Sequence, residues 1–353
     1  GCAPYKNILS CGFTVDEQGR KMSKSLGNGV DPADVTSKWG ADVLRLWVAS
    51  ADYAQDVSIS DNILKQVSDA YRRFRNTFRF LLGNLSDFDD QANAISNWDD
   101  LEPIDQYMMA KTAQLLVDVE QAYDSFKFNG VYRAVYDFVN DLSSVYMDVT
   151  KDRLYSESPD SPRRRAVQTV LFNILEVLVR VLSPILSFTA DEVWECYPEA
   201  MRNREGRVGN VQLAGWPHRS DFVPALPGKL AEEKVLAAFG NALEVRDVVT
   251  KALEDARGAK VINKSQEATV SVTAPQATLD ALSAFDASVF EELFIVSGVT
   301  FAAGEELACE VKLAEGDKCP RCWNYRELGG NANHPDVCQR CGDALDAIGF
   351  TEE

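Results

Sequence analysis

One stretch of the chain, from Asp61 to about Trp194, repeats apolar residues at helical spacing and constrains the fold more than any other feature. In its first helix the apolar residues recur three and four positions apart, which places them on one face. They are Ile63, Leu64, Val67, Ala70, Tyr71, Phe74, Phe78, Leu81 and Leu82. Further helices are expected at about Pro103–Phe126, Lys127–Tyr155 and Val167–Leu182, where Pro184 ends or kinks the last one. Several amphipathic helices with short connections predict a helical bundle.

Mixed α and β structure is expected on both sides of this bundle. Before it, Ile8–Val15 has strand character, and Asp31-Pro32 has the residue types that start a helix. After it, a segment rich in proline and glycine leads to a helix at about Lys229–Ala256. Alternating apolar residues then predict a strand at Glu267–Thr273, followed by a helix at Leu279–Leu293 and a strand at Val299–Phe301.

The chain is therefore expected to be mainly α, with five consecutive parts. They are a small α/β piece (1–60), a helical bundle (61–217), a linker (218–228), a small α+β junction domain (229–314) and a cysteine-bearing module (315–353).

Four of the eight cysteines form two CxxC pairs, Cys319/Cys322 and Cys338/Cys341, separated by fifteen residues. Zinc prefers four ligands in a tetrahedron, and this spacing is typical of such sites. Because protein fills all four positions, the predicted role of the single zinc ion is structural. A redox CxxC pair or two disulfides are the alternatives. Residues from about 315 onward should depend on the metal, since they contain few large apolar side chains.

Lys21-Met22-Ser23-Lys24-Ser25, the KMSKS loop, is the second motif that indicates a chemical role. Its ammonium groups can meet a polyphosphate and stabilise charge that develops on a leaving phosphate. A solvated basic loop is the alternative reading. A pentapeptide of this kind arises by chance in such a chain only on the order of once in ten thousand, which favours the functional reading.

The charge balance and the apolar runs limit the class of protein. A formal charge of −18 means that any contact with nucleic acid must use local basic patches on an acidic body. No apolar run has the length of about 20 residues that a membrane helix needs. The chain is not a small disulfide-rich secreted domain, so a cytoplasmic location and no membrane contact are expected. It begins Gly1-Cys2-Ala3-Pro4 without methionine, so the natural chain is expected to extend upstream.

The motifs together resemble the class I aminoacyl-tRNA synthetases, most closely the isoleucyl family, over essentially the whole chain. The resemblance lies in segments on both sides of the KMSKS loop, in the first and last helices of the bundle and in the cysteine module. These segments are Ala3–Lys6, Gly12-Phe13, Gly40–Asp42, Leu44–Trp47, Tyr71–Leu82, Ser183–Leu186, Phe188–Trp194 and Cys319–Trp323. The family frequently has histidine at the position of Cys11. Contacts of this residue near the active site are therefore expected to differ from those of the family.

The resemblance implies a function for each part. Residues 1–60 would be the C-terminal end of the catalytic domain, and residues 61–217 an anticodon-binding domain. Lys24 would bind ATP phosphates and Lys21 would assist catalysis. The complete enzyme would use ATP with magnesium to activate isoleucine and transfer it to the isoleucine tRNA. The family's first signature, HIGH, is absent from a chain whose only histidines are His218 and His334. The fragment alone is therefore expected to be inactive, and a monomer.

Several side chains are candidates for tRNA contact. Arg321, Trp323, Arg326 and Arg340 cluster around the cysteines, where an aromatic ring can stack on a base and arginines can meet phosphates. Packing of Trp323 over the metal site is the equal alternative. Two arginine groups in the bundle, Arg72–Arg79 and Arg163–Arg165, could touch RNA or be solvated or salt-bridged.

A different class of function is the alternative. The cysteine module also resembles the zinc finger of formamidopyrimidine-type DNA glycosylases, which would make the chain a zinc-ribbon DNA-binding module. The KMSKS loop and the long helical bundle argue against this reading.

Overall fold

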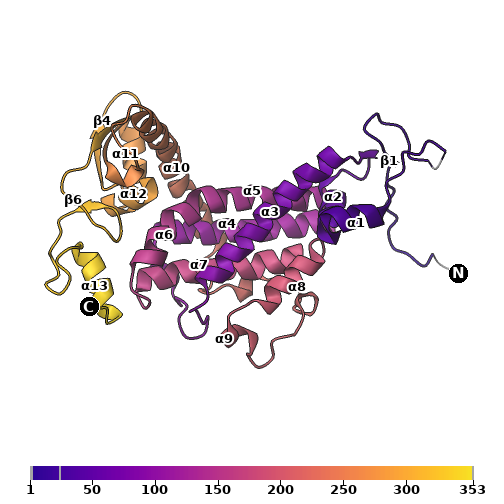
Figure 1. Ribbon diagram of the computed structural model, residues 1–353, viewed down its shortest axis with the longest axis horizontal. Coiled ribbons are helices and arrows are strands. Elements are labelled where there is room, and N and C mark those ends of the chain that lie inside the picture. The colour runs from indigo at the N-terminus through magenta and orange to yellow at the C-terminus, as the bar shows by residue number, and fades with distance from the viewer. Residues whose placement is uncertain (1–2, 24, 352–353) are drawn as a thin grey trace. The chain divides into compact units, whose positions relative to one another are not determined.

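The computed structural model describes residues 3–23 and 25–351 and has the mainly α fold class that the sequence predicts (Figure 1). Contacts divide the chain into two compact units. The first takes the residues up to Asp87, Thr112–Asp141 and Ile174–His218, and the second takes Phe88–Lys111, Leu142–Asn173 and the residues from Arg219 onward. Helices α4 (Pro103–Asp124) and α7 (Pro162–Leu182) have residues in both units.

In the first unit, helix α2 (Ala41–Ser50) packs against α1 (Pro32–Trp39), α3 (Asp61–Asn84), α5 (Phe128–Asp141) and α8 (Ser187–Glu195). Helix α9 (Glu199–Arg202) and the short turn η3 (Val211–Leu213) follow. Asp31 caps α1 by accepting a hydrogen bond from the Ala33 amide, as the sequence predicts. Six residues of the predicted apolar stripe of α3 are buried, while Ile63, Tyr71 and Leu82 are only partly buried. The helix also buries two polar side chains outside the stripe, Ser68 and Thr77.

Most arginines of α3 already have partners within this unit. Arg72 pairs with Asp69 at 3.0 Å, and Arg75 pairs with Glu192 at 2.8 Å. Arg73 donates to the side-chain oxygen of Asn140 at 2.7 Å. These contacts favour the salt-bridged reading of the arginine group in this helix.

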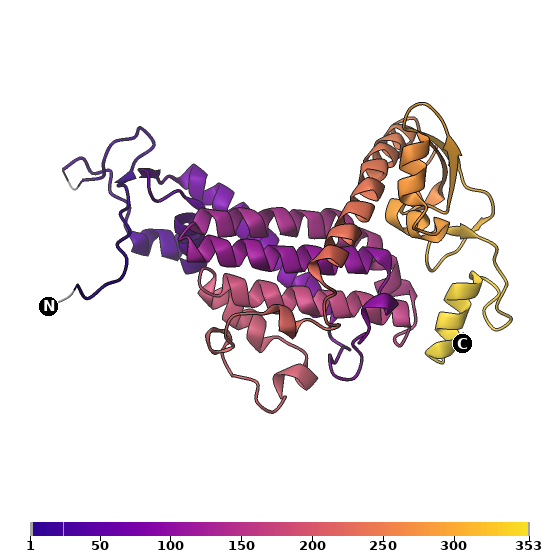
Figure 2. The same cartoon turned by 180° about the vertical axis from the view of Figure 1, so that it is seen from behind.

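In the second unit, a three-stranded sheet has β3 (Ala268–Ala274) in its centre. It runs parallel to β4 (Gly298–Ala303) and antiparallel to β5 (Ala308–Leu313). Helix α10 (Lys229–Gly258) contacts β3 and β5, while α11 (Gln276–Leu282) and α12 (Ala287–Phe294) contact β4 (Figures 1 and 2). The buried residues of β3 alternate as predicted, because one face of the strand meets these helices.

The cysteine module completes the second unit with two short strands, β6 (Asp317–Lys318) and β7 (Tyr325–Arg326), and helix α13 (Gln339–Ala347). Short turns η1 (Trp98–Asp100), η4 (Arg219–Asp221) and η5 (Ser265–Glu267) lie in its connections. In the described part of the chain, no helix combines the length and apolar character needed to cross a membrane.

A buried ionic network joins segments of the second unit that are distant in sequence. Arg153 is only 1% exposed, and its Nη1 donates to Asp105 at 2.8 Å. Its Nε bonds to Glu292 of α12, and the Tyr146 hydroxyl donates to Asp105 at 2.7 Å. Arg163 pairs with Glu102, Glu157 and Glu292. A charge buried as deeply as that of Arg153 requires such partners. Through Glu292, Arg153 links α12 to α6 (Met147–Ser156), and the more exposed Arg163 links it to α7.

Three predicted elements differ in the structure. The predicted strand Ile8–Val15 is reduced to β1 (Thr14–Val15), because its partner β2 (Val57–Ser58) offers only two residues for pairing. The predicted helix Lys127–Tyr155 is divided into α5 and α6 by a π-helical turn, η2 (Leu142–Tyr146). That turn buries both Leu142 and Tyr146.

The third difference is the predicted helix Leu279–Leu293, which is two helices, α11 and α12. The Ser283 hydroxyl donates to the Asp280 carbonyl at the end of α11, which satisfies a group that helix continuation would have used. The chain restarts at Ala287, so that Phe290, Leu293 and Phe294 of α12 are buried.

Candidate metal centre and KMSKS loop

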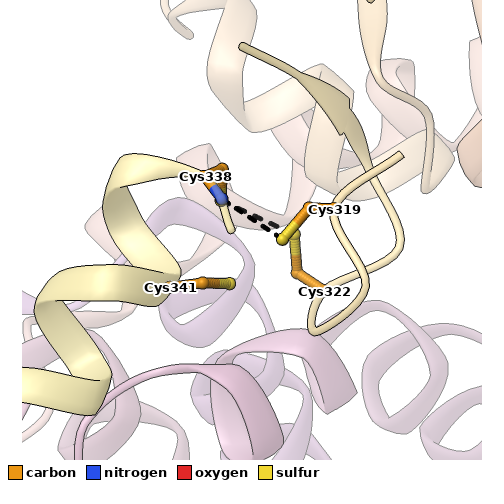
Figure 3. A group of neighbouring side chains, drawn as sticks. All are labelled: Cys319, Cys322, Cys338 and Cys341. Carbon is orange, nitrogen blue, oxygen red and sulfur yellow. Dashed lines mark hydrogen bonds between the residues drawn. The ribbon is translucent and has the colours of Figure 1, made fainter. Parts of the chain in front are cut away.

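The four cysteines that the sequence pairs lie together and are buried. Cys319 and Cys322 occupy the turn between β6 and β7, which we call the zinc knuckle (residues 319–324). Cys338 directly precedes α13, and Cys341 lies in its first turn. Figure 3 shows the side chains of Cys319, Cys322 and Cys341 directed toward the space between the knuckle and the start of α13, beside Cys338. The ligand atoms all lie within 4.8 Å of one another, and no other such group was found among the described residues.

This arrangement fits a zinc ion. A tetrahedron with zinc–sulfur bonds of about 2.3 Å separates its sulfur atoms by about 3.8 Å. The Sγ atoms of Cys322 and Cys338 are 3.9 Å apart, far more than the roughly 2 Å of a disulfide bond. The donor set is entirely sulfur, which suits zinc, and it leaves no coordination position for a substrate. The fit is therefore to a structural zinc ion.

Ionisation of the thiols points the same way. Hydrogen bonds from Cys338 and Cys341 lower the pKa of the Cys322 thiol well below its usual range. Hydrogen bonding to Cys322 raises the pKa values of Cys338 and Cys341 in turn. A buried cluster of this kind holds one thiolate readily, but it needs a nearby cation before all four can lose their protons.

Backbone hydrogen bonds shape the zinc knuckle. The Trp323 amide donates to the Cys319 carbonyl at 2.8 Å, and the Cys338 amide donates to Cys319 Sγ at 3.4 Å. Trp323 adopts a φ of 67°, in the left-handed region that side chains other than glycine rarely occupy. Gly342, after Cys341, leaves room for Asn331, whose Cβ would lie 2.4 Å from an added Cβ.

Two of the predicted tRNA-contact residues bind α6 instead of pointing freely outward. Arg321 donates through Nη1 to the carbonyl of Ser156 at the end of α6. Arg340 bonds to both carboxylate oxygens of Asp152, with Nη2 3.0 Å from Oδ1, and its Nη1 lies 3.6 Å from Glu157. Burial alone would lower the pKa of the Arg340 guanidinium, but the Asp152 carboxylate outweighs it and raises that pKa. Each CxxC pair thus contributes one arginine that attaches the zinc module to α6.

The other two candidates are more accessible. Trp323 is 47% exposed, and the ammonium of Lys264 lies 4.0 Å from its ring centre. Arg326 is exposed, with its guanidinium 3.9 Å from Glu291. The ring of Trp323 therefore keeps surface for a further contact.

The KMSKS loop is the second candidate site, and its described residues are exposed or partly exposed. Lys24 lies outside the described residues, whereas Lys21 is exposed with its ammonium 3.7 Å from the ring centre of Phe13. The Ser23 amide donates to the side-chain oxygen of Asn28 at 3.0 Å, and the hydroxyls of Ser23 and Ser25 are 3.1 Å apart. The loop thus has internal hydrogen bonds that hold its base.

Asp16 and Asn28 position this loop, a role that the sequence did not reveal. The Asp16 carboxylate accepts hydrogen bonds from the amides of Gln18 and Arg20, from Arg20 Nε and from Asn28 Nδ2. The bond from Asn28 is the largest cause that lowers the pKa of Asp16 well below its usual range. The only sequence signal for this role is Asn28, which follows the KMSKS loop.

Three known families match successive segments of the chain. Residues 1–60 match the family described as tRNA synthetases class I (I, L, M and V). Residues 105–272 match the anticodon-binding domain of tRNA ligase. Residues 316–343 match the zinc finger found in FPG and IleRS, which contains the four cysteines.

Curated relatives agree with these matches. An isoleucine–tRNA ligase from Geobacillus kaustophilus is 46% identical over 97% of this chain, and one from Syntrophomonas wolfei is 43% identical over 98%. One from Thermotoga maritima is 42% identical over 97% of this chain. The chain spans 37% of the length of each of these relatives. A class I synthetase segment, an anticodon-binding domain and a zinc finger of the isoleucyl type thus follow one another along one sequence, and the chain belongs to the isoleucyl-tRNA synthetase family.

Proposed function

We propose that this chain is the part of an isoleucine–tRNA ligase that recognises the anticodon arm of the isoleucine tRNA. The observation that carries the proposal is the match of residues 105–272 to an anticodon-binding domain, followed in the same chain by the zinc finger. An anticodon loop presents unstacked bases, which is where proteins read RNA sequence.

The complete enzyme would join isoleucine to its tRNA with ATP and magnesium. In that enzyme Lys24 would bind the ATP phosphates and Lys21 would assist, since mobile ammonium groups stabilise charge on a leaving phosphate. The 353-residue chain alone should not activate isoleucine, because its sequence contains no HIGH signature. We also propose a cytoplasmic monomer with the five parts bounded at residues 60, 217, 228 and 314.

Among the predicted tRNA contacts, the described geometry gives Trp323 and Arg326 the best access. Trp323 has an exposed ring, and the Arg326 side chain makes only one long ion pair at 3.9 Å. Arg321 and Arg340 bind α6, so their part in recognition would be to place the zinc knuckle. The positive guanidinium groups still contribute to the local field on an acidic protein.

A binding comparison tests the proposal against the DNA-binding alternative. The purified chain is titrated with fluorescent anticodon stem-loops of isoleucine tRNA and of an unrelated tRNA, and with duplex DNA of the same length. We expect the isoleucine stem-loop to bind most tightly. Preference for duplex DNA would support the zinc-ribbon DNA-binding module and overturn the assignment to tRNA.

Trp323→Ala tests the predicted contact within the same assay. If the ring stacks on a base, the substitution should weaken stem-loop binding by about 1–3 kcal/mol. Leu313→Ala removes another exposed apolar side chain from the same unit and serves as the control. A Trp323→Ala variant that keeps its zinc and its melting temperature, and binds as tightly as the parent, would assign the ring to packing alone.

A further inference from the structure

A second basic site lies in the same unit, in a cavity of about 290 Å³ outside the zinc module. Its walls come from α6, the second half of α10, the segment that precedes β3, and the end of α12. Four cations line it: Lys151, Arg246, Arg257 and Lys264. Asp148 is the single carboxylate in the lining, and it pairs with Lys151 at 2.6 Å.

The other three cations have no carboxylate partner. Among the described residues, no carboxylate oxygen lies within ion-pairing distance of Arg246, Arg257 or Lys264. With Lys151 and Asp148 included, the lining holds four cations against one carboxylate. The lining therefore carries an uncompensated positive charge on an acidic protein.

Arg246 is held in place although its charge is not neutralised. Its Nε donates to the carbonyl of Leu293 at 3.2 Å, and its Nη2 donates to the carbonyl of Ser144 at 3.2 Å. Burial lowers the pKa of its guanidinium, and Asp148 and Asp247 only partly oppose that effect. A desolvated guanidinium that bonds only to neutral carbonyls has no anion to balance its charge. An anion bound in the cavity would therefore stabilise the charged guanidinium.

Lys264 connects this cavity to the exposed aromatic ring of the zinc knuckle. Its ammonium lies 4.0 Å from the ring centre of Trp323 while the residue also lines the cavity. A nucleotide stacked on Trp323 would bring its phosphate toward the same ammonium. Paired aromatic and cationic groups of this kind bind single-stranded nucleic acid, with the ring contacting the base and the cations the backbone.

We propose that Arg246, Arg257 and Lys264 form a phosphate-binding subsite, and that its ligand is a backbone phosphate of the single-stranded anticodon loop. The proposal rests on the proposed tRNA function for the source of the phosphate. Three unpaired cations around one cavity would also bind a free phosphate compound. Arg257 and Lys264 are exposed and bind the phosphate directly, whereas Arg246 is half-buried and fixes the inner wall.

Salt dependence measures the number of phosphates that the site neutralises. The labelled isoleucine anticodon stem-loop is titrated at several salt concentrations with the parent chain and with two variants, Arg257→Gln and Lys264→Gln. Each variant should weaken binding by roughly threefold to tenfold and lower the slope of log K against log salt by about 0.7, the value for one contact to a single strand. Lys251→Gln, an exposed position of the same helix that does not line the cavity, should change neither.

The outcomes separate the subsite from the proposed function. If the parent binds the stem-loop and both variants retain its affinity and slope, the subsite is refuted and tRNA recognition stands. A second arm uses inorganic pyrophosphate, whose binding is followed by titration calorimetry. In one outcome the parent binds pyrophosphate but not the stem-loop, and both variants fail to bind pyrophosphate. That result would support a phosphate-binding site and would rule out RNA as the source of the phosphate. Binding of neither probe would overturn the proposal.

Discussion

The zinc module and the KMSKS loop are both identifiable from short motifs, yet their geometry differs. All four ligands of the zinc module are buried within one cluster, and their sulfur atoms lie within 4.8 Å of one another. In the described part of the KMSKS loop, Lys21 is exposed and the hydrogen bonds hold only the base of the turn. One motif forms a complete site within the chain, and the other presents groups that need further partners.

The difference follows from the chemistry of each ligand. A zinc ion is small and needs four donors, which two tight turns supply. A nucleotide is large and needs contacts from several segments, so a loop that binds it stays open until the ligand and the remaining segments are present. A short stretch of sequence can therefore supply a complete site for a small ligand, but only part of a site for a large one.

Removal of one zinc ligand should give the largest effect and tests whether the zinc module is a complete site. Cys338→Ser should reduce bound zinc from one ion per chain to none, because three thiolates no longer close the tetrahedron. Structural zinc sites contribute about 10–16 kcal/mol in isolated peptides, so residues from about 316 onward should lose amide protection while α3 keeps it. Elemental analysis and hydrogen exchange measure the two effects.

Cys309→Ser is the matched control for this experiment. Cys309 is half-buried in β5 and outside the metal cluster, and burial raises the pKa of its thiol to about 11. The control should keep one zinc ion per chain. Full zinc content in Cys338→Ser, with the module still protected, would contradict the assignment of the four ligands.

The next effect in size tests the KMSKS loop as part of a larger site. In a complete ligase that contains this chain, Lys24→Ala should slow isoleucine-dependent ATP–pyrophosphate exchange roughly a hundredfold to a thousandfold, the usual effect of losing one contact to developing charge. Lys38→Ala, which removes a surface pair with Asp61 and a contact of the ammonium with the Trp39 ring, is the control. Near-normal exchange in Lys24→Ala would refute the role of Lys24 in ATP binding. Exchange by the 353-residue chain alone would show that this chain already contains a complete active site.

Local patterns were enough to predict the four-cysteine cluster, most of the α3 stripe and the strand β3. These features depend on spacings within a few residues or on side chains close in sequence. The strand predicted at Ile8–Val15 was wrong because strand length depends on a partner, and β2 has only two residues. The Arg340–Asp152 pair joins residues 188 positions apart, and one sequence carries no signal for such a contact.

The contacts of Arg340 allow a test of whether the zinc module is independent of α6. Arg340→Gln removes the charged partner of Asp152 and one of the cations near Glu157, so the attachment should weaken by about 1–3 kcal/mol. We expect faster transfer of zinc to a chromophoric chelator and a lower midpoint of urea unfolding. Arg326→Gln removes a longer, more exposed ion pair and should change stability by about 0.5 kcal/mol or less. Equal zinc release from both variants and the parent would show that the module holds its metal without α6.

The smallest effect concerns the base of the KMSKS loop and asks how far that loop is organised without a ligand. Asp16→Asn keeps one oxygen for the amides of Gln18 and Arg20 but places an NH₂ group where Oδ2 accepts from Asn28 and Arg20 Nε. Amide exchange of Met22 and Ser23 should quicken by roughly twofold to tenfold, as expected for one or two lost hydrogen bonds. Asp31→Asn, which preserves the cap of α1, should leave that exchange unchanged.

The same bonds predict a pH dependence in the parent chain. Since the folded pKa of Asp16 is depressed, its contribution is present above the unfolded value of 3.8 and is lost only as pH falls through the lower folded value. The amide shifts of Gln18 and Arg20 should therefore stay constant from neutral pH to about pH 4, the ordinary range of an aspartate, and change only in stronger acid. A titration of these amides centred near the ordinary aspartate pKa would show that Asp16 does not hold the loop. The KMSKS loop would then depend on bonds such as those of Ser23 to Asn28 and Ser25, and its contrast with the zinc module would be greater.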